Sequence, residues 1–345
     1  MHQYIEYSRV SGQEREMEGY IWNEKQGMTL KKAIGAREIT GQETSAELIA
    51  ILAAVTDGEP RVMTIHDASE LPSGPFEQEH RSLQSSLRTW VEKLTHHPLG
   101  YVEQLYTFAD RDRMDGDASM QRVISISYLG LTLEGSASGQ QELGWRNWYD
   151  YFPWEDRRAG VPALFDAVIV PQLRNWVQQA QGPARESQWQ RAAMTFGLEG
   201  HGWNEELVLQ RYELLYEAQL VPEALRGQLR ADKVVVPGRR MVADHRRILA
   251  TGIARLRAKI KYRPVVFELM PATFTLLQLQ RRVEALAGRL VHKQNFRRLI
   301  EQQELVEETG DITSDTGGRP AKLFRFRHAV LAERAIAGTK LPLSL

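Results

Sequence analysis

The chain has 345 residues, of which 42% are hydrophobic and 8% aromatic, and this is enough for two packed domains. It has no cysteine, which excludes disulfides and thiolate metal sites and is typical of a reducing cytoplasm. The first residues lack the basic and apolar regions of a signal peptide, and no run approaches the ~20 apolar residues of a membrane span, so we expect a cytoplasmic protein without a membrane partner.

The formal net charge of zero hides an uneven distribution. Residues 241–345 contain 19 Lys and Arg against 10 Asp and Glu, so the preceding 240 residues carry a net charge of −9. A basic end on an acidic body indicates that one end of the chain meets a polyanion. The alternative is a chance distribution of charge.

The N-terminal half predicts a mixed α/β domain. Residues 1–44 show no apolar period, and we expect an N-terminal extension there. Apolar runs at 48–55 and 61–65 flank Asp57-Gly58, a strong signal of a β-hairpin. A helix is then indicated by apolar residues at helical spacing, which are Leu83, Leu87, Trp90, Val91 and Leu94. With strands over 102–108 and 122–133, this order favours an α/β/α sandwich.

The middle of the chain is aromatic and helical. The aromatic cluster at 145–154 is expected to close the sheet. Helices over 165–179 and 205–219 belong to a helical insertion at about 160–235, for which packing or dimerisation is favoured over ligand binding. A long helix at 242–260 follows. Apolar residues line one face of it, and we expect its cations on the other: Arg246, Arg247, Arg255, Arg257 and Lys259.

Residues 274–327 predict a winged helix-turn-helix. Thr275 and Gln278 form a capping box at the start of one helix, Gly288 ends it, and a second helix runs over about 291–302. Phe296, Leu299 and Ile300 share one face of the second helix. Strands at 305–306 and 323–326 follow, around a glycine-rich turn. The predicted DNA-binding residues, whose donors suit phosphates and base edges, are His292, Lys293, Gln294, Asn295, Arg297, Arg298, Arg319 and Lys322. The alternative is an amphipathic helical hairpin with a solvated basic face.

Three segments of this region carry a family resemblance. Asn295-Phe296-Arg297-Arg298, Leu305-Val306-Glu307-Glu308 and Gly318-Arg319-Pro320-Ala321-Lys322-Leu323-Phe324-Arg325-Phe326 resemble the C-terminal domain of the Nudix-related, NrtR-like transcriptional regulators. That family controls genes of NAD metabolism, and the long form here is most similar to its NadQ branch. The resemblance implies a Nudix-like sensing domain at 45–262 and a winged helix DNA-binding domain at 263–345. It also implies a repressor that binds a two-fold symmetric operator as a homodimer.

The Nudix resemblance allows a test of catalysis. A working Nudix box, G-x5-E-x7-R-E-U-x-E-E-x-G, uses its glutamates to hold the divalent metals that activate water. Gly74, Arg88 and Glu92 fit this pattern, whereas Thr89 and Lys93 stand where it requires glutamates. One carboxylate beside a lysine cannot assemble the usual metal cluster, so we expect no catalytic residues, no metal site and no required cofactor.

The resemblance implies instead an effector nucleotide, which is ADP-ribose, NAD or ATP. The predicted effector-binding residues, which include a stacking ring and phosphate donors, are Gly74, Arg88, Glu92, Phe108, Asp110, Arg111 and Arg113. A solvated loop is the alternative for residues 111–113.

Two other functions stay open. The first is an active Nudix hydrolase of ADP-ribose-type diphosphates with an appended winged helix domain, against which the broken box argues. The second is a scaffold whose basic end binds protein or RNA. A separate match to the end of the Nudix box, at Glu304 to Gly310, lacks the upstream half of the motif and is not expected to be catalytic.

Overall fold

The computed structural model describes residues 44–75, 85, 87–89, 91–92, 99–108, 122–134, 143–225, 234–314 and 320–330. Residues 1–43 lie outside the described residues. Residues 44–345 form one compact unit, and all that follows concerns its described part.

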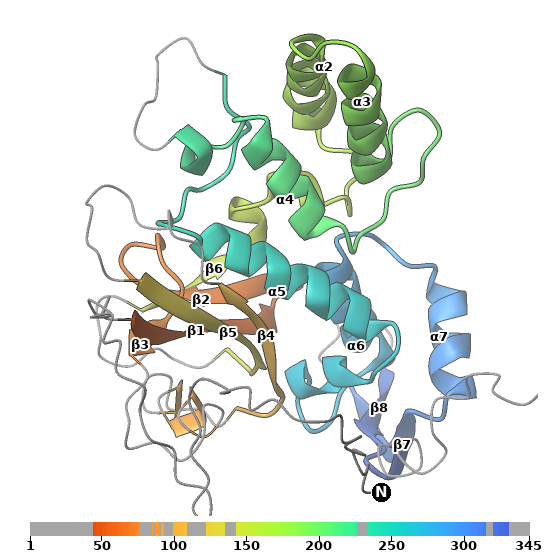
Figure 1. Ribbon diagram of the computed structural model, residues 1–345. Helices are drawn as coiled ribbons and strands as arrows, with labels where there is room; N and C mark the ends of the chain where they lie inside the picture. The colour runs from red at the N-terminus through yellow and green to blue at the C-terminus, as the bar shows by residue number, and fades with distance from the viewer. Residues whose placement is uncertain are drawn as a thin grey trace, which may run out of the picture. The chain divides into compact units, whose positions relative to one another are not determined.

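A six-stranded mixed sheet is at the centre of this unit (Figure 1). Its path is β4-β5-β1-β2-β6, with β3 also paired to β1. The strands are β1 (Thr44–Thr56), β2 (Glu59–Thr64), β3 (Ser73–Pro75), β4 (Val102–Phe108), β5 (Arg122–Leu131) and β6 (Gly144–Asn147). Only β1 and β5 pair in parallel among these strands. The predicted hairpin is confirmed: Asp57 and Gly58 join β1 to β2 with φ of 53° and 76°, as a tight hairpin turn requires.

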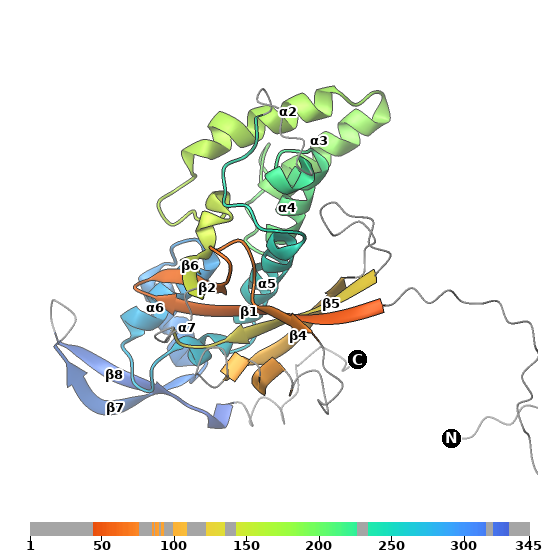
Figure 2. The same cartoon turned by 90° about the vertical axis from the view of Figure 1, so that its left-hand side faces the viewer.

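Residues 48–55 of strand β1 are all apolar because helices cover both faces of the sheet. Leu48, Ala50 and Leu52 belong to one buried cluster, which also contains Leu87 and Val91 from the helical residues 85–92. Ile49 and Ile51 point the other way, into a larger cluster that contains Ile248 and Ile253 of α5 (His245–Ile260). Figure 2 shows α5 crossing one face of the sheet. The predicted α/β/α sandwich is therefore confirmed.

The aromatic segment after β6 and the helical insertion stand on the α5 side. Their elements are η1 (Trp148–Asp150), η2 (Pro153–Glu155), η3 (Phe165–Ile169), α2 (Val170–Gln178), α3 (Pro183–Phe196), α4 (Val208–Glu217) and η4 (Pro222–Leu225). The α2–α3 hairpin stands clear of the sheet in both views (Figures 1 and 2). The sequence reading missed α3, although Pro183 at its first position and the left-handed Gly197 at its end are typical helix boundaries.

The C-terminal elements form a winged helix, as predicted. They are η5 (Val265–Leu269), α6 (Leu276–Ala287), α7 (Lys293–Gln302), β7 (Val306–Thr313) and β8 (Ala321–Phe326). The capping box is present: Gln278 N donates to Thr275 Oγ1 at 3.2 Å, and Thr275 N donates to Gln278 Oε1 at 2.7 Å. Phe274 exchanges two backbone hydrogen bonds with Phe324 of β8 in an isolated antiparallel bridge, which ties the start of α6 to the hairpin.

Two sequence expectations about side chains are wrong. Leu299 was expected on the apolar face of the second helix, but it is 48% exposed; only Phe296 and Ile300 pack against the core, and both are half-buried. Arg246 and Arg257 were expected on the outer face of α5, but both are fully buried. Each is accommodated by a buried glutamate from elsewhere in the chain.

The winged helix shares its core with the sheet domain. Leu279 and Leu286 of α6 belong to the same buried cluster as Ile51 of β1. The division of the chain after residue 262 therefore stays a prediction. None of the described helices combines the length and the apolar character that a membrane span needs.

Candidate DNA-binding and effector sites

Helix α7 presents a polar, cationic surface. None of its residues is fully buried, and its half-buried side, Phe296 and Ile300, is the only part that packs on the core. The side chains predicted to bind DNA are exposed, and they are His292, Lys293, Gln294, Asn295, Arg297 and Arg298. Lys293 and Arg297, and likewise Gln294 and Arg298, are four residues apart, so they form two adjacent rows along the helix.

The first turn of α7 is open as well. His292 is the N-cap residue, and its side chain makes no capping hydrogen bond. The N–H groups at a helix start have no partner within the helix and favour a phosphate. With these N–H groups and the two rows of side-chain donors, the N-terminal end of α7 is suited to bind in the major groove of DNA.

The charges of the wing are arranged differently from those of α7. Lys322 Nζ lies 2.9 Å from a Glu308 oxygen, and Arg325 Nε lies 2.7 Å from Glu307. In contrast, Lys293, Arg297 and Arg298 of α7 make no ion pair with any described residue. Lys322 would have to leave Glu308 to bind a phosphate, and Arg319 lies outside the described residues.

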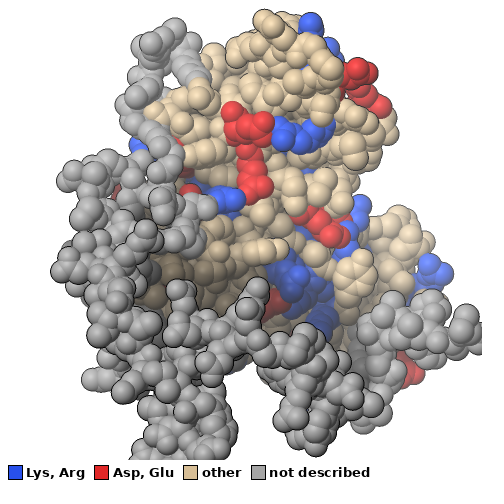
Figure 3. Space-filling view, in the orientation of Figure 1, with Lys and Arg blue, Asp and Glu red and all other residues tan. Residues whose placement is uncertain are grey.

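Cations elsewhere in the C-terminal part are mostly neutralised. Every arginine and lysine of α5 pairs with a glutamate that precedes residue 241, through Glu223, Glu213, Glu103 and Glu155. Figure 3 shows blue and red side chains interspersed over the helical half of the visible face, without one large basic patch. Besides the cations of α7, the exposed Arg263 and Arg281 also form no ion pair with a described residue.

The second Nudix-box match is in the wing. Glu307 and Glu308 lie in strand β7, where each forms the ion pair described above. Over the described ranges, no group of three or more His, Asp or Glu side chains is placed to hold a metal ion. This match lies in a strand whose carboxylates are paired with cations, whereas a working Nudix box carries its glutamates on a helix, and its lack of catalysis stays a prediction.

Two of the predicted effector residues, Arg88 and Glu92, lie in the helical segment that begins at residue 85, and Gly74 lies in β3. Gly74 lies opposite Leu48 in the β1–β3 pair, and Leu48 packs in the same cluster as Leu87 and Val91. Glu92 is exposed. Arg88 donates to the carbonyl oxygens of Leu99 and Gly100, the latter at 3.1 Å. The guanidinium thus holds the loop before β4, and it could bind a phosphate only by giving up these bonds.

The other predicted effector residues follow β4. Phe108, the last residue of this strand, is 8% exposed and lies in the main core, with the guanidinium carbon of Arg247 5.6 Å from its ring centroid. Its ring would have to become accessible to stack on a base. Asp110, Arg111 and Arg113 lie outside the described residues, so their role stays a prediction.

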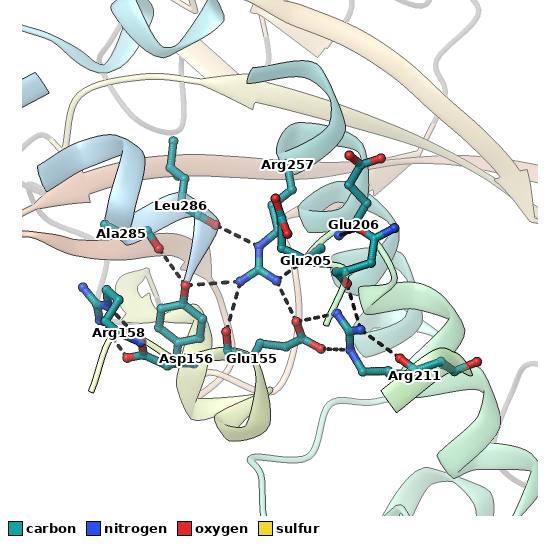
Figure 4. Close-up of polar contacts among 12 residues, drawn as sticks. Glu155, Asp156, Arg158, Glu205, Glu206, Arg211, Arg257, Ala285 and Leu286 are labelled. Atoms are coloured by element: carbon teal, nitrogen blue, oxygen red, sulfur yellow. Dashed lines mark hydrogen bonds and ion pairs between the residues drawn. The ribbon is translucent and has the colours of Figure 1, made fainter. Parts of the chain in front are cut away.

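Sequence reasoning missed a buried polar network next to α6, which Figure 4 shows. Glu155 of η2 is 1% exposed and binds both Arg211 of α4 and Arg257 of α5. Burial alone would raise the pKa of the Glu155 carboxyl, but the two guanidiniums offset this and hold the pKa below its usual value. The network is therefore charged at neutral pH, although it is closed to water.

Comparison with known proteins identifies the domain type of the C-terminal part of the chain. Residues 266–326 match the NrtR DNA-binding winged helix domain. A protein of Acinetobacter baylyi named ADPR responsive transcriptional repressor NtrR is 41% identical over 83 residues, which are 24% of this chain and 33% of that protein. The chain thus matches only about a third of the length of this curated relative.

Solved structures extend the similarity to the fold. The crystal structure of Shewanella oneidensis NrtR complexed with a 27mer DNA has a TM-score of 0.50 at 18% identity, over 83% of this chain and 95% of that one. A MutT/nudix family protein from Enterococcus faecalis has a TM-score of 0.48 at 15% identity, over 83% and 88%. The chain is similar to NrtR-like regulators, with a Nudix-type fold joined to a winged helix. Its place in the NadQ branch stays a prediction.

Proposed function

We propose, starting from the NrtR-type winged helix domain that this chain carries, that it is a DNA-binding transcriptional regulator. The observation that carries the proposal is the exposed surface of α7, on which Lys293, Arg297 and Arg298 have no carboxylate partner among the described residues. Phosphate contacts position such a helix, and Gln294 and Asn295 have the side-chain amides that pair with adenine. We further propose that the protein acts in the cytoplasm and represses genes of NAD biosynthesis.

The Nudix-like part is proposed to sense an adenine nucleotide rather than to hydrolyse one. The similarity to a repressor described as ADPR responsive favours ADP-ribose over NAD and ATP as the effector. Thr89 and Lys93 in place of glutamates leave Glu92 as one carboxylate where a metal cluster needs several. Residues 45–262 would form this sensor, and residues 263–345 the DNA-binding domain.

A homodimer completes the proposal. A single winged helix buries little surface on DNA, and specific affinity usually needs two half-sites about one helical turn apart. The operator would then be two-fold symmetric.

The decisive experiment selects duplexes from a random library with the purified full chain and measures affinity for the selected sequence by fluorescence anisotropy. Arg297→Ala/Arg298→Ala should lose most of this affinity. The matched control is Arg174→Ala/Arg185→Ala, which removes the same charge from the exposed faces of the α2–α3 hairpin. Equal loss in the two variants, or no selection of any duplex, would contradict the proposal.

A second assay separates the alternative functions. Adding ADP-ribose should change operator affinity without release of product in the presence of Mg²⁺. Turnover of ADP-ribose would favour the hydrolase, and tighter binding of RNA than of the selected duplex would favour the scaffold.

A further inference from the structure

The last turn of α6 is held by groups from the sensor part of the chain. Terminal carbonyls of a helix have no partner within the helix and need one from elsewhere. Here Tyr149 Oη donates to Ala285 O at 2.7 Å, and Arg257 Nε donates to Leu286 O at 2.8 Å. All of these donors and acceptors are buried. A third bond, from Arg157 N to Gly288 O, measures 2.7 Å.

Gly288 shows how closely the two parts fit. It ends α6 in the left-handed conformation with φ of 69°. A Cβ added there would lie 2.8 Å from both Tyr149 Oη and Arg257 Nη2, and it would overlap the backbone oxygen of Glu155. The position therefore accepts no side chain while the contact is intact.

The donors are themselves fixed by the buried ion network (Figure 4). Arg257 Nη1 donates to Glu155 Oε2 at 2.6 Å, and Arg211 Nε donates to Glu155 Oε1 at 2.5 Å. Arg257 Nη2 also donates to Tyr149 Oη, at 3.2 Å. One glutamate thus connects η2, α4 and α5, and through Tyr149 and Arg257 it connects all three to α6. We call Tyr149, Glu155 and Arg257 the α6 clamp.

The clamp also determines where α7 points. Only the segment 288–292 separates α6 from α7, and Glu284 of α6 accepts a hydrogen bond from Val291 N at 3.0 Å. Gln280 donates to the same carboxylate oxygen at 2.9 Å. Because α6 and the start of α7 are tied together, fixing the end of α6 fixes the orientation of the cationic surface of α7.

Such a network resists partial opening. Removing one partner from a buried ion pair leaves an uncompensated charge out of water, so the clamp is stable closed or fully released but not in between. A two-state element of this kind is what coupling between distant sites requires, provided that each ligand favours one of its two states.

We propose that Tyr149, Glu155 and Arg257 are positioning residues that couple effector binding in the sensor to the orientation of α7. The inference rests on the proposed function, since it specifies how that sensor reaches the DNA-binding helix. None of the three forms a hydrogen bond or ion pair with the described members of the predicted effector set or with α7. Their role is to transmit a change between the two parts.

A matched pair of variants tests this inference. Tyr149→Phe removes the hydroxyl that bonds to Ala285 O, while Arg257 keeps Glu155, Leu286 O and Glu205 O as acceptors. Tyr151→Phe is the control: Tyr151 is also buried, and its hydroxyl donates at the same 2.7 Å, but to Ala68 O within the sensor part. The first variant loosens α6, and the second does not.

The readout is the ratio of operator affinities without and with ADP-ribose, together with ADP-ribose affinity by calorimetry. Allosteric ratios are typically ~5–150-fold. Tyr149→Phe should reduce the ratio towards one while ADP-ribose affinity stays within about twofold of its unperturbed value, and Tyr151→Phe should keep the ratio. An unchanged ratio in Tyr149→Phe, or equal loss in both variants, would overturn the inference.

Hydrogen exchange of residues 285–302 provides a readout that needs no DNA. ADP-ribose should change this exchange in the parent chain and in Tyr151→Phe but not in Tyr149→Phe, whose exchange should be faster throughout. If the chain binds no duplex but this pattern holds, the proposed function fails and the clamp stands. If both variants exchange alike, the clamp is wrong. Gly288→Ala, compared with Gly197→Ala at the left-handed end of α3, repeats the test from the α6 side.

Discussion

Glu155→Gln is the sharpest test of the energetics described above. Glutamine keeps the shape of the side chain but removes its charge, and it turns one acceptor into a donor that faces a guanidinium. The remaining amide oxygen can accept from only one of the two guanidiniums, and otherwise Arg211 keeps the carbonyl oxygens of Thr195 and Asn204 while Arg257 keeps those of Leu286 and Glu205 together with the Tyr149 hydroxyl. Two guanidiniums are left in a site from which their shared carboxylate is gone.

Breaking a buried ion pair from one side costs ~3–5 kcal/mol in free energy of unfolding. Unfolding entropies near ~2 cal/mol/K per residue convert this, for residues 44–345, into a thermal midpoint lowered by about 5–8 °C. The effect depends on pH. Because the folded pKa of Glu155 is lowered, its contribution is complete above the unfolded pKa of ~4.3 and is lost as pH falls through the folded value. The difference in thermal midpoint between the parent chain and Glu155→Gln should therefore be constant near neutral pH and become smaller in acid.

Circular dichroism melts at pH 7 and on acidification measure this difference. The matched control is Glu217→Gln, because Glu217 pairs with Arg191 at 2.6 Å with both side chains 49% exposed. An exposed pair of this kind contributes less than ~1 kcal/mol, so the control should melt within about 2 °C of the parent chain. If Glu155→Gln melts no lower than Glu217→Gln, the network does not hold the fold together, and the clamp argument loses its energetic basis.

Four further predictions concern DNA, hydrolysis and assembly. Arg298→Ala should lower affinity for every duplex and reduce the slope of log affinity against log salt by ~0.9; Lys322→Ala should change that slope less, because Glu308 already neutralises Lys322. Gln294→Ala should cost ~1–3 kcal/mol on the selected operator and little on random DNA, which competition binding assays measure. ADP-ribose turnover with Mg²⁺ should stay below ~1 s⁻¹, and a higher rate abolished by Glu92→Gln would contradict the loss of catalysis. Sedimentation at micromolar concentration should show a dimer; a monomer that protects one half-site would refute it.

Local signals in the sequence were sufficient to predict the helices of the winged helix domain. The capping box depends on two residues three positions apart, and the end of α6 depends on one glycine in the left-handed conformation. The exposed face of α7 likewise follows from helical spacing alone. What spacing could not show is how deeply α7 packs: Phe296 is half-buried and Leu299 is exposed, because few side chains of the neighbouring elements reach this helix. Phe296→Ala is therefore expected to cost less than the ~3–5 kcal/mol of a fully buried phenylalanine.

The burial of Arg246 and Arg257 of α5 could have been predicted from the sequence, but both residues were assigned to the exposed face of the helix. Arg246 and Arg257 are eleven residues apart, about three helical turns, and this spacing puts both on the side of Ile253. A charge in the apolar register of a helix indicates a buried partner. The partner itself could not be found in this way, since Glu155 lies 102 positions from Arg257, and only the tertiary fold brings them together.

The same pairing changes the meaning of the charge distribution. A basic C-terminal end and an acidic remainder were taken to indicate that the basic end meets a polyanion. In the structure, all five cations of α5 and also Lys261 and Arg289 pair with glutamates from Glu103 to Glu223, so part of the asymmetry is neutralised inside the molecule. The excess that remains for DNA is smaller, and it includes Lys293, Arg297 and Arg298 of α7. The net charge of a long segment therefore predicts a nucleic-acid surface poorly when the opposite charges lie in a segment that folds against it. Unpaired cations on an exposed helix are a better indication of such a surface.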